Sequence, residues 1–256
     1  MDSLAKMRVD VVKMWVDDNR GRLPKLTPEI WRAAIRQARW HGMKTFVHLW
    51  DLEDARGLAR DGVDVIAHSI RDKEVDADLI ASLKRNNVTA VGTISRERSL
   101  FAYASGPEWL DDPFFTKSVT PEVIRELKSG AFRKKQASDP NLDLHRKAFD
   151  IDVRNLKRLA DSGVRIGFGT DSGQPGRFPG FFEHWEMELM VQAGLTPMQV
   201  IQSFSRNAAE ALGTASLGTI EPGKAADLIV LDRDPLKDIR STRAIQAVYV
   251  GGRKLQ

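Results

Sequence analysis

Residues 44–69, KTFVHLWDLEDARGLARDGVDVIAHS, hold two short apolar strands separated by one helical stretch. His48 lies near the end of the first strand, and His68 lies at the end of the second. The stretch between them begins at Asp51, a residue type that caps helix starts, and stops at Gly62, a residue type that ends helices. A strand, a helix and a strand in this order are typical of a parallel sheet. These residues therefore predict an α/β fold.

The same alternation continues on both sides of this unit. Apolar runs at residues 9–16, 88–94 and 164–172 predict three more strands, so five strand–helix units are expected in total. The expected helices cover residues 27–42, 51–61, 75–86, 143–162 and 195–213.

Residues 95–142 interrupt this rhythm. Apart from a helix start at Thr120 and Pro121, we expect a loop here, far longer than the usual connection between a strand and a helix. Long loops at the carboxyl edge of a parallel sheet generally carry substrate contacts. The last part of the chain differs again, because GTIEPGKAADLIVLD (218–232) and AIQAVYVGGRKL (244–255) read as short strands with Gly and Pro turns. We therefore predict two domains, at residues 1–216 and 217–256.

Composition excludes several classes of protein. The 256 residues are 42% hydrophobic, enough for a sizeable core, and no apolar run approaches the ~18 residues of a membrane span. The N-terminal MDSLAKMRVD lacks the apolar core of a secretory signal, so a cytoplasmic location is expected. The net charge of +4 comes from basic residues scattered among acidic ones, so neither nucleic acid nor a membrane is an expected partner. A small-molecule substrate remains.

Four polar residues lie where predicted strands end: Lys13, His48, His68 and Asp171. The carboxyl ends of parallel strands meet at one edge of a sheet, so these side chains are candidate metal ligands. A single strand-end histidine is more often structural, but two on consecutive strands converge on one point. The chain has no cysteine, so any metal site uses nitrogen and oxygen ligands.

Two of these residues carry further chemistry. Burial of Lys13 would favour its neutral amine, which can react with carbon dioxide to give a carbamate, an anionic ligand able to bridge two cations. The alternative is a lysine that extends into solvent. Asp171 can bind a metal and take a proton from water, or it can cap the loop that follows.

Weaker candidates for substrate contacts are His145, His184, Arg96, Arg98 and Tyr103. The histidines are as readily structural or exposed, and arginines in loops are usually solvated. The aromatic residues at 109–115 and 178–185 are more often packing residues of a lid than a cofactor site.

Several segments together resemble the amidohydrolase superfamily, in particular its imidazolonepropionase-like and Xaa-Pro dipeptidase-like branch. VDVVKMWVDD (9–18), KTFVHLW (44–50), VDVIAHS (63–69) and IGFGTDSG (166–173) look like the segments of that branch that carry its strand-end ligands. GLTPMQVIQSFSRNAAEALG (194–213) and LGTIEPGKAADLIVLDRDPL (217–236) are similar to the family's last barrel helices and returning β-sandwich segment. The similarity extends over nearly the whole chain, and its C-terminal part is highly specific.

The resemblance implies a partial TIM-type (β/α)8 barrel, about strands 4–8, followed by a piece of a small β-sandwich. By this comparison the chain is truncated at its N-terminus, because it begins just before strand 4. Five strands of an eight-stranded barrel leave two open edges, which favours aggregation or association into a homo-oligomer.

The resemblance also implies the ligand sets. One metal would take a carboxylated Lys13 with His48 and His68, and a second would keep only Lys13 and Asp171, because no His-x-His pair occurs in the chain. The expected cofactor is one or two divalent ions, zinc first, with Asp171 as the catalytic acid and base. The expected reaction is hydrolysis of a C–N bond in a dipeptide-like or cyclic amide. The alternative is an inactive fragment or degenerate relative that only binds metal or associates with itself.

Overall fold

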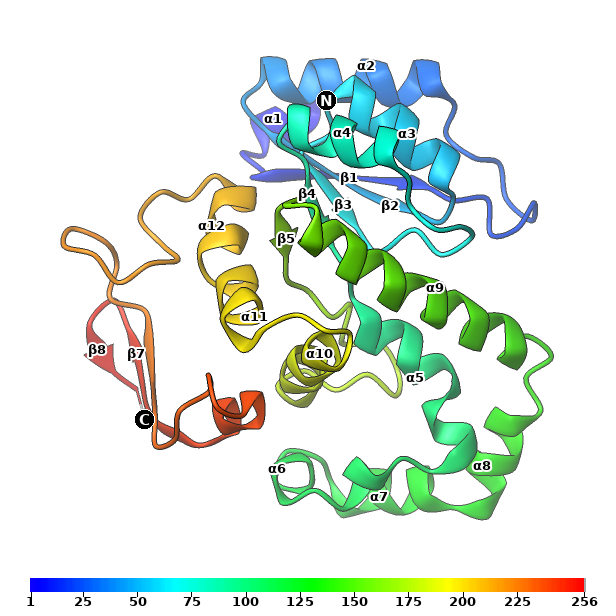
Figure 1. Cartoon of the computed structure of the whole chain (residues 1–256), viewed down its shortest axis with the longest axis vertical. Coiled ribbons are helices and arrows are strands. Elements are labelled where there is room, and N and C mark those ends of the chain that lie inside the picture. Colours follow the sequence, from blue (N-terminus) through cyan, green and yellow to red (C-terminus); the bar gives the residue numbers. More distant parts are fainter. Residues whose placement is uncertain (256) are drawn as a thin grey trace.

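A five-stranded parallel sheet forms the centre of the computed structural model, which describes residues 1–255 (Figure 1). Its strands are β1 (Val11–Val16), β2 (Lys44–Leu49), β3 (Val65–Ala67), β4 (Thr89–Val91) and β5 (Ile166–Gly167). They lie side by side in chain order, each parallel to the next. The α/β fold and the five strands expected from the sequence are confirmed, with shorter bounds than the apolar runs suggested.

Each strand turns one face toward covering helices. In β1, Val12, Met14 and Val16 are buried, whereas Lys13 and Trp15 between them are exposed on the opposite face. The helices α2 (Pro28–Trp40), α3 (Leu52–Asp61) and α4 (Ala77–Arg85) lie together over the buried face (Figure 1). Because side chains alternate along a strand, Lys13, the one polar residue of β1, points to the open face together with Trp15.

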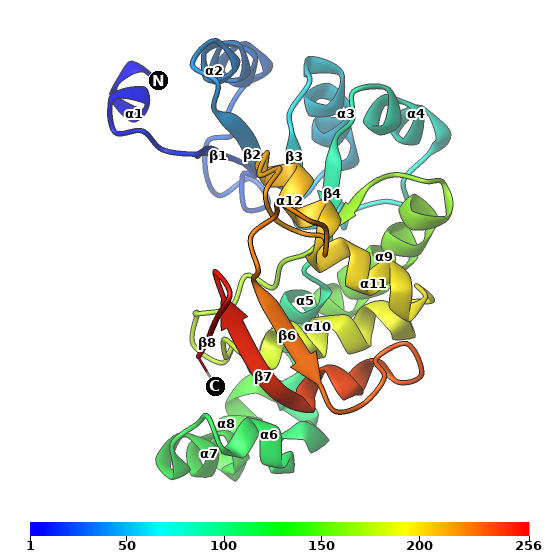
Figure 2. The same ribbon diagram turned by 90° about the vertical axis from the view of Figure 1, so that its left-hand side faces the viewer.

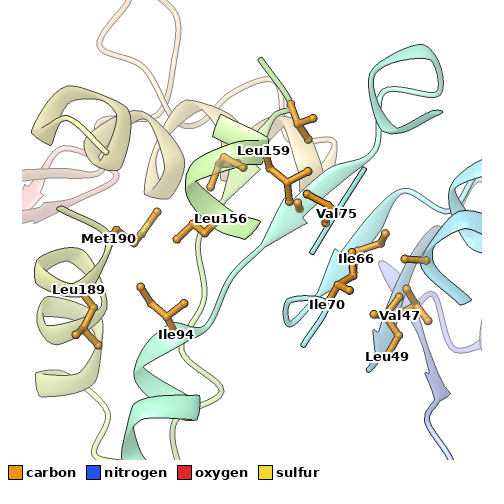
Figure 3. Packing of buried hydrophobic residues seen from close by; sticks show 14 of the residues in the cluster. Val47, Leu49, Ile66, Ile70, Val75, Ile94, Leu156, Leu159, Leu189 and Met190 are labelled. Atoms are coloured by element: carbon orange, nitrogen blue, oxygen red, sulfur yellow. The ribbon is translucent and has the colours of Figure 1, made fainter. Parts of the chain in front are cut away.

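The main core lies between the sheet and its helices. Val47, Leu49, Ile66 and Ile70 pack on one side of it, and leucines of α9 (Leu142–Asp161) continue it toward β4 (Figure 3). Local signals fix the helix ends as expected: α3 stops at Gly62, whose φ of +80° suits glycine. The N-cap Asp76 accepts a hydrogen bond from the Leu79 backbone N–H at the start of α4.

The expectation of a long loop at residues 95–142 is wrong, because this segment is mostly helical. It contains α5 (Ile94–Ser105), the 3-10 turn η1 (Glu108–Asp111), α6 (Pro113–Thr116), α7 (Pro121–Lys128) and α8 (Gly130–Ala137). Glu186 from a later helix accepts hydrogen bonds from the backbone N–H groups of Ile94 and Ser95, which caps α5 from outside the segment. A tertiary cap of this kind leaves no local sequence signal.

The C-terminal part follows the prediction more closely. After α10 (Phe181–Gln192), the expected helix over 195–213 is two helices, α11 (Pro197–Phe204) and α12 (Arg206–Leu212), separated at Ser205. The tail then forms a small antiparallel sheet, apart from the parallel one (Figure 2). Its elements are β6 (Leu228–Leu231), the 3-10 turn η2 (Ile239–Arg243), β7 (Ile245–Val250) and β8 (Arg253–Lys254), and a short α1 (Asp2–Lys6) begins the chain.

Across residues 1–255, no helix combines the length and the apolar character that crossing a membrane requires.

Candidate metal centre

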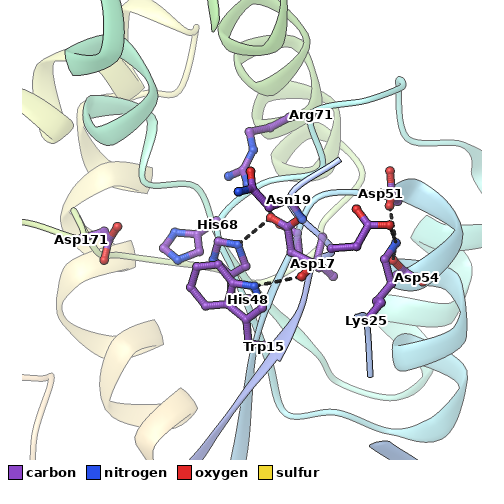
Figure 4. Close-up of polar contacts among 12 residues, drawn as sticks. Trp15, Asp17, Asn19, Lys25, His48, Asp51, Asp54, His68, Arg71 and Asp171 are labelled. Carbon is purple, nitrogen blue, oxygen red and sulfur yellow. Dashed lines mark hydrogen bonds and ion pairs between the residues drawn. The ribbon is translucent and has the colours of Figure 1, made fainter. Parts of the chain in front are cut away.

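The candidate ligands lie at the carboxyl edge of the parallel sheet, where Figure 4 shows His48 and His68 side by side and Asp171 apart from them. Lys13 lies in β1 and His48 in β2, His68 directly follows β3, and Asp171 lies in the loop after β5. The rings of His48 and His68 meet edge to face, with centroids 4.7 Å apart. The charge of Asp171 acts on the pKa of Lys13, and the charge of Lys13 acts on that of His68, so all four residues share one electrostatic environment.

The backbone at this edge is left-handed at three non-glycine residues. His68 has φ +74°, Thr93 after β4 has φ +61°, and Asp171 has φ +52°. Such values cost a non-glycine residue of order 1–3 kcal/mol and cluster at functional sites. The sheet edge therefore uses strained turns to orient side chains where its strands end.

His48 is held on two sides and keeps one nitrogen unpaired. It is 2% exposed, its Nε2 lies 3.0 Å from Oδ2 of Asp17, and its ring stacks on Trp15 at 3.6 Å with an interplanar angle of 9°. The neighbouring carboxylate assigns the ring proton to Nε2, because a carboxylate only accepts. Nδ1 is then a lone pair, and it is buried with no hydrogen-bond partner. Burial lowers the pKa of His48 to about 4, although the hydrogen bond to Asp17 opposes this.

His68 is the second buried imidazole. Its Nδ1 lies 2.9 Å from Oγ1 of Thr93, which leaves Nε2 as its other nitrogen. Burial lowers its pKa well below the usual range, and the positive charges of a protonated His48 and of Arg96 act in the same direction. Both histidines are therefore neutral at pH 7, the form in which imidazole binds metal.

Lys13 differs from the expectation of a buried amine. Its side chain is exposed, because β1 is an edge strand and Lys13 points to the open face of the sheet. Partial burial of the amine still lowers the pKa of Lys13, and the negative charge of Asp171 only partly offsets this. A lowered pKa increases the neutral fraction that carbamate formation needs.

Asp171 is engaged by arginines rather than by the histidines. Its Oδ2 lies 3.1 Å from Nε of Arg96 and 2.6 Å from Nη1 of Arg177. Within residues 1–255, no group of three or more His, Cys, Asp or Glu side chains is arranged to hold a metal ion. The structure thus brings His48, His68 and Lys13 to one edge, with Asp171 turned toward cations beside them.

A buried chain of charges supports this arrangement. Arg96 is paired with Glu97, which is fully buried and lies 3.0 Å from Nη1 of Arg71. Arg71 is 2% exposed, and its guanidinium lies 4.6 Å from the ring centroid of Trp50. Asp152 lies within the same charge cluster, and burial together with Glu97 raises its pKa well above the usual range. Charges alternate from Arg71 to Asp171, so each ion in that chain has an opposite neighbour.

The weaker candidates divide into two groups. Arg96 lies at the site and contacts Asp171. His145 lies near enough for the charges of Glu97 and Arg96 to act on its pKa, which burial lowers; Glu97 opposes this change and Arg96 adds to it. Tyr103 is 4% exposed and donates its hydroxyl to the Gly176 carbonyl, so it is a packing residue in this structure. His184 contacts Thr242 in the tail, at 2.8 Å between Nδ1 and Oγ1.

Sequence reasoning missed several residues that shape the site: Trp15, Asp17, Arg71, Glu97 and Arg177. Trp15 and Asp17 had a usable signal, because they follow Lys13 at i+2 and i+4 and so share its face of the strand. Arg177 had none, since the loop that returns it to Asp171 is irregular.

The donor set fits a divalent ion in part. His48 Nδ1 and a His68 nitrogen are neutral, adjacent imidazole donors, and a buried nitrogen without a partner is rare unless something binds it. Lys13 is the third group at that edge, and it needs carboxylation to act as a ligand.

The chain is similar to known proteins in sequence and in fold. A profile described as the amidohydrolase family matches residues 115–255. The imidazolonepropionase of Deinococcus deserti is 36% identical over 87 residues, which cover 34% of this chain and 22% of that protein. The ochratoxinase of Aspergillus niger is 30% identical over 145 residues, which cover 54% of this chain and 28% of that protein.

Solved structures match over almost the whole chain. A Xaa-Pro dipeptidase with methionine bound in its active site has a TM-score of 0.70 at 24% identity, over 98% of this chain and 55% of that one. The A. niger ochratoxinase has a TM-score of 0.70 at 19% identity, over 98% of this chain and 52% of that one. At these identities the likeness concerns the fold, and the chain spans about half the length of these structures.

Proposed function

The chain belongs to the amidohydrolase family, and we propose that it carries the metal-binding edge of a hydrolase that cleaves a carbon–nitrogen bond. Its relatives include an imidazolonepropionase, a 5-methylthioadenosine/S-adenosylhomocysteine deaminase and a Xaa-Pro dipeptidase. All three names belong to enzymes that act on C–N bonds. A dipeptide-like or cyclic amide is therefore the proposed substrate class.

The proposed architecture follows from the same likeness. The sheet β1–β5 would correspond to about strands 4–8 of an eight-stranded barrel within residues 1–216. The antiparallel strands β6–β8 would belong to a β-sandwich segment within residues 217–256. The chain order and the parallel pairing of β1 to β5 support the assignment of these strands to a barrel.

One observation carries the functional proposal: two neutral imidazoles meet at the carboxyl edge, and one of them has a buried nitrogen without a partner. His48, His68 and a carboxylated Lys13 would hold a divalent ion there, with zinc as the proposed metal. When bound, the ion would polarise a carbonyl group and increase the acidity of water.

The protein residues would supply proton transfer and orientation. Asp171 would accept a proton from the attacking water and return it to the leaving nitrogen. For this, its carboxylate must face the substrate, so one of its two arginine contacts would have to give way. Arg96 and Arg177, which both contact Asp171, would also be available to bind an anionic group of the substrate.

Metal analysis of the purified chain, combined with amidase and dipeptidase assays, tests this function. We expect about one equivalent of zinc per chain and hydrolysis that a chelator abolishes. In the presence of bicarbonate, mass spectrometry should detect the added mass of carbon dioxide on wild type but not on Lys13→Ala. Metal bound without turnover on any substrate would rule out the enzyme function for this chain.

A second candidate has its own observation. Asp171 is paired with two arginines, so the proposed catalytic carboxylate is not free in this structure. An inactive protein that binds metal, or associates through the unpaired edges of β1 and β5, is consistent with this. Light scattering of the purified chain, combined with the same activity assays, separates the enzyme from the inactive protein. A monomer that turns over substrate excludes the second candidate, and an inactive oligomer supports it.

A further inference from the structure

Asp17 is fixed more firmly than its position after an edge strand suggests. Its side chain is 14% exposed, and its Oδ2 lies 3.0 Å from His48 Nε2. Its Oδ1 accepts a hydrogen bond from the Asn19 backbone N–H at 2.7 Å. Both carboxylate oxygens are therefore committed, one to the turn after β1 and one to the imidazole.

Trp15 closes the other side of the same imidazole. It lies directly beside His48 in the register of β1 and β2, and their rings stack almost in parallel. The indole is itself anchored, because Nε1 donates to the Asp17 carbonyl at 3.0 Å. The plane of the His48 ring is thus set by Trp15, and its rotation within that plane is set by Asp17.

This double restraint decides which nitrogen of His48 carries the lone pair. Turning the ring over would break the hydrogen bond to Asp17 and leave a buried carboxylate oxygen without that donor, which is costly. With the proton held on Nε2, Nδ1 remains bare and buried, and the His68 ring lies edge to face with the His48 ring. A histidine whose other nitrogen donates to a carboxylate is the usual arrangement at metal sites.

We propose that Asp17 is a positioning residue, which together with Trp15 presents Nδ1 of His48 to a divalent cation. This role rests on the proposed metal-binding function. Asp17 touches neither cation nor substrate; it acts by fixing the tautomer and the direction of the lone pair.

Three variants of the full chain test the role. Asp17→Ala removes both hydrogen bonds and the charge, whereas Asp17→Asn removes the charge and replaces one of the two acceptor oxygens by an NH2 donor, so its single oxygen can serve His48 or the Asn19 N–H but not both. Asp18→Asn is the matched control, because Asp18 contacts the Gly21 backbone and Lys25 rather than a histidine. Circular dichroism and thermal unfolding establish that each variant is folded.

The first readout needs no metal. Long-range proton–nitrogen NMR of the metal-free protein reports the tautomer of each histidine. We expect wild type and Asp18→Asn to carry the His48 proton on Nε2. Asp17→Ala should carry it partly or wholly on Nδ1, and an unchanged tautomer in this variant would overturn the proposal.

The second readout is zinc affinity, measured by competition with a chromophoric chelator. We expect Asp17→Ala to weaken binding about 10- to 100-fold, Asp17→Asn to weaken it less, and Asp18→Asn to match wild type. Equal affinities of wild type and Asp17→Ala overturn the inference while the proposed function stands. Absence of zinc binding to wild type overturns both. If Asp17→Ala does not fold, Trp15→Phe and Trp15→Ala are compared instead. Phe keeps an aromatic ring against the His48 ring and Ala removes it, so zinc should bind more weakly to Trp15→Ala than to Trp15→Phe. Equal zinc affinities of these two variants would contradict the proposal.

Discussion

The fully buried His48 in β2 and the half-buried His184 in α10 show that histidines with similarly lowered pKa values can have different surroundings. Burial lowers the pKa of each to about 4. His184 uses Nδ1 to contact Thr242 and packs its ring edge to face on Phe114, with centroids 4.8 Å apart. His48 leaves Nδ1 without a partner and lies against His68. A lowered pKa alone therefore does not single out a candidate ligand; our proposal rests on the unpartnered nitrogen of His48 and the adjacent ring of His68.

The comparison predicts the largest difference for metal binding. His68→Ala removes one of two adjacent donors, so zinc affinity should fall by about 100-fold or more. His184→Ala is the matched change in the other region and should leave zinc affinity within about twofold of wild type. Competition with a chelator measures both, and equal losses would show that the ligands are misassigned.

The tail should respond in stability rather than in metal binding. Arg243 in η2 pairs with Asp112 and Glu188, and its guanidinium lies 5.0 Å from the ring centroid of Phe181. Arg243→Ala leaves two partly buried carboxylates unpaired, so the free energy of unfolding should fall by about 2 kcal/mol. Urea unfolding measures the loss. A drop in zinc affinity of the folded variant would contradict the separation of the two regions.

The contribution of His184 to stability should depend on pH. An unfolded histidine has a pKa of about 6.5, whereas folded His184 has a pKa of about 4. Between these values the unfolded chain binds more protons, so stability is present above pH 6.5 and is lost as the pH falls toward 4.

His184→Asn removes this contribution, so its stability should decrease by about 1 kcal/mol less than that of wild type between pH 7 and pH 5. Urea unfolding at both pH values measures the difference. Zinc should not change the contribution of His184 to stability, because we place the metal at His48 and His68. Identical slopes for variant and wild type would mean that His184 is not buried in its neutral form.

The smallest effect is expected at Tyr103, which the sequence suggested as a substrate contact. Tyr103→Phe removes the hydrogen bond to the Gly176 carbonyl and should cost about 1 kcal/mol of unfolding free energy. Catalytic and metal-binding constants should stay as in wild type. A large rise in KM without loss of stability would restore the substrate role.

Local patterns were sufficient for the parallel sheet. Apolar runs and the end signals at Asp51 and Gly62 predict β2, α3 and β3 in their observed order. Between residues 94 and 137, only the helix start at Thr120 and Pro121 was predicted, and α7 confirms it. The helix α5 was missed because its start depends on Glu186, which lies 92 residues after Ile94 in the chain. Long-range caps leave no trace in a local pattern.

The sequence predicted which polar residues lie at the carboxyl edge of the sheet, but not which residues they pair with; their role as ligands stays a prediction. Strand ends located His48 and His68 because parallel strands share one carboxyl edge. The partner of Asp171 could not be predicted, since Arg177 reaches it through an irregular loop. The exposure of Lys13 also escaped prediction, because alternation gives the face of a strand but not what covers that face.

The central claim is that this sheet edge binds a divalent metal through two histidines. Zinc K-edge X-ray absorption of the loaded protein counts imidazole ligands directly. We predict two imidazole nitrogens at about 2.0–2.1 Å in wild type, one in His48→Ala, and two in His184→Ala. A spectrum without imidazole scattering, or one that His48→Ala leaves unchanged, would contradict the claim.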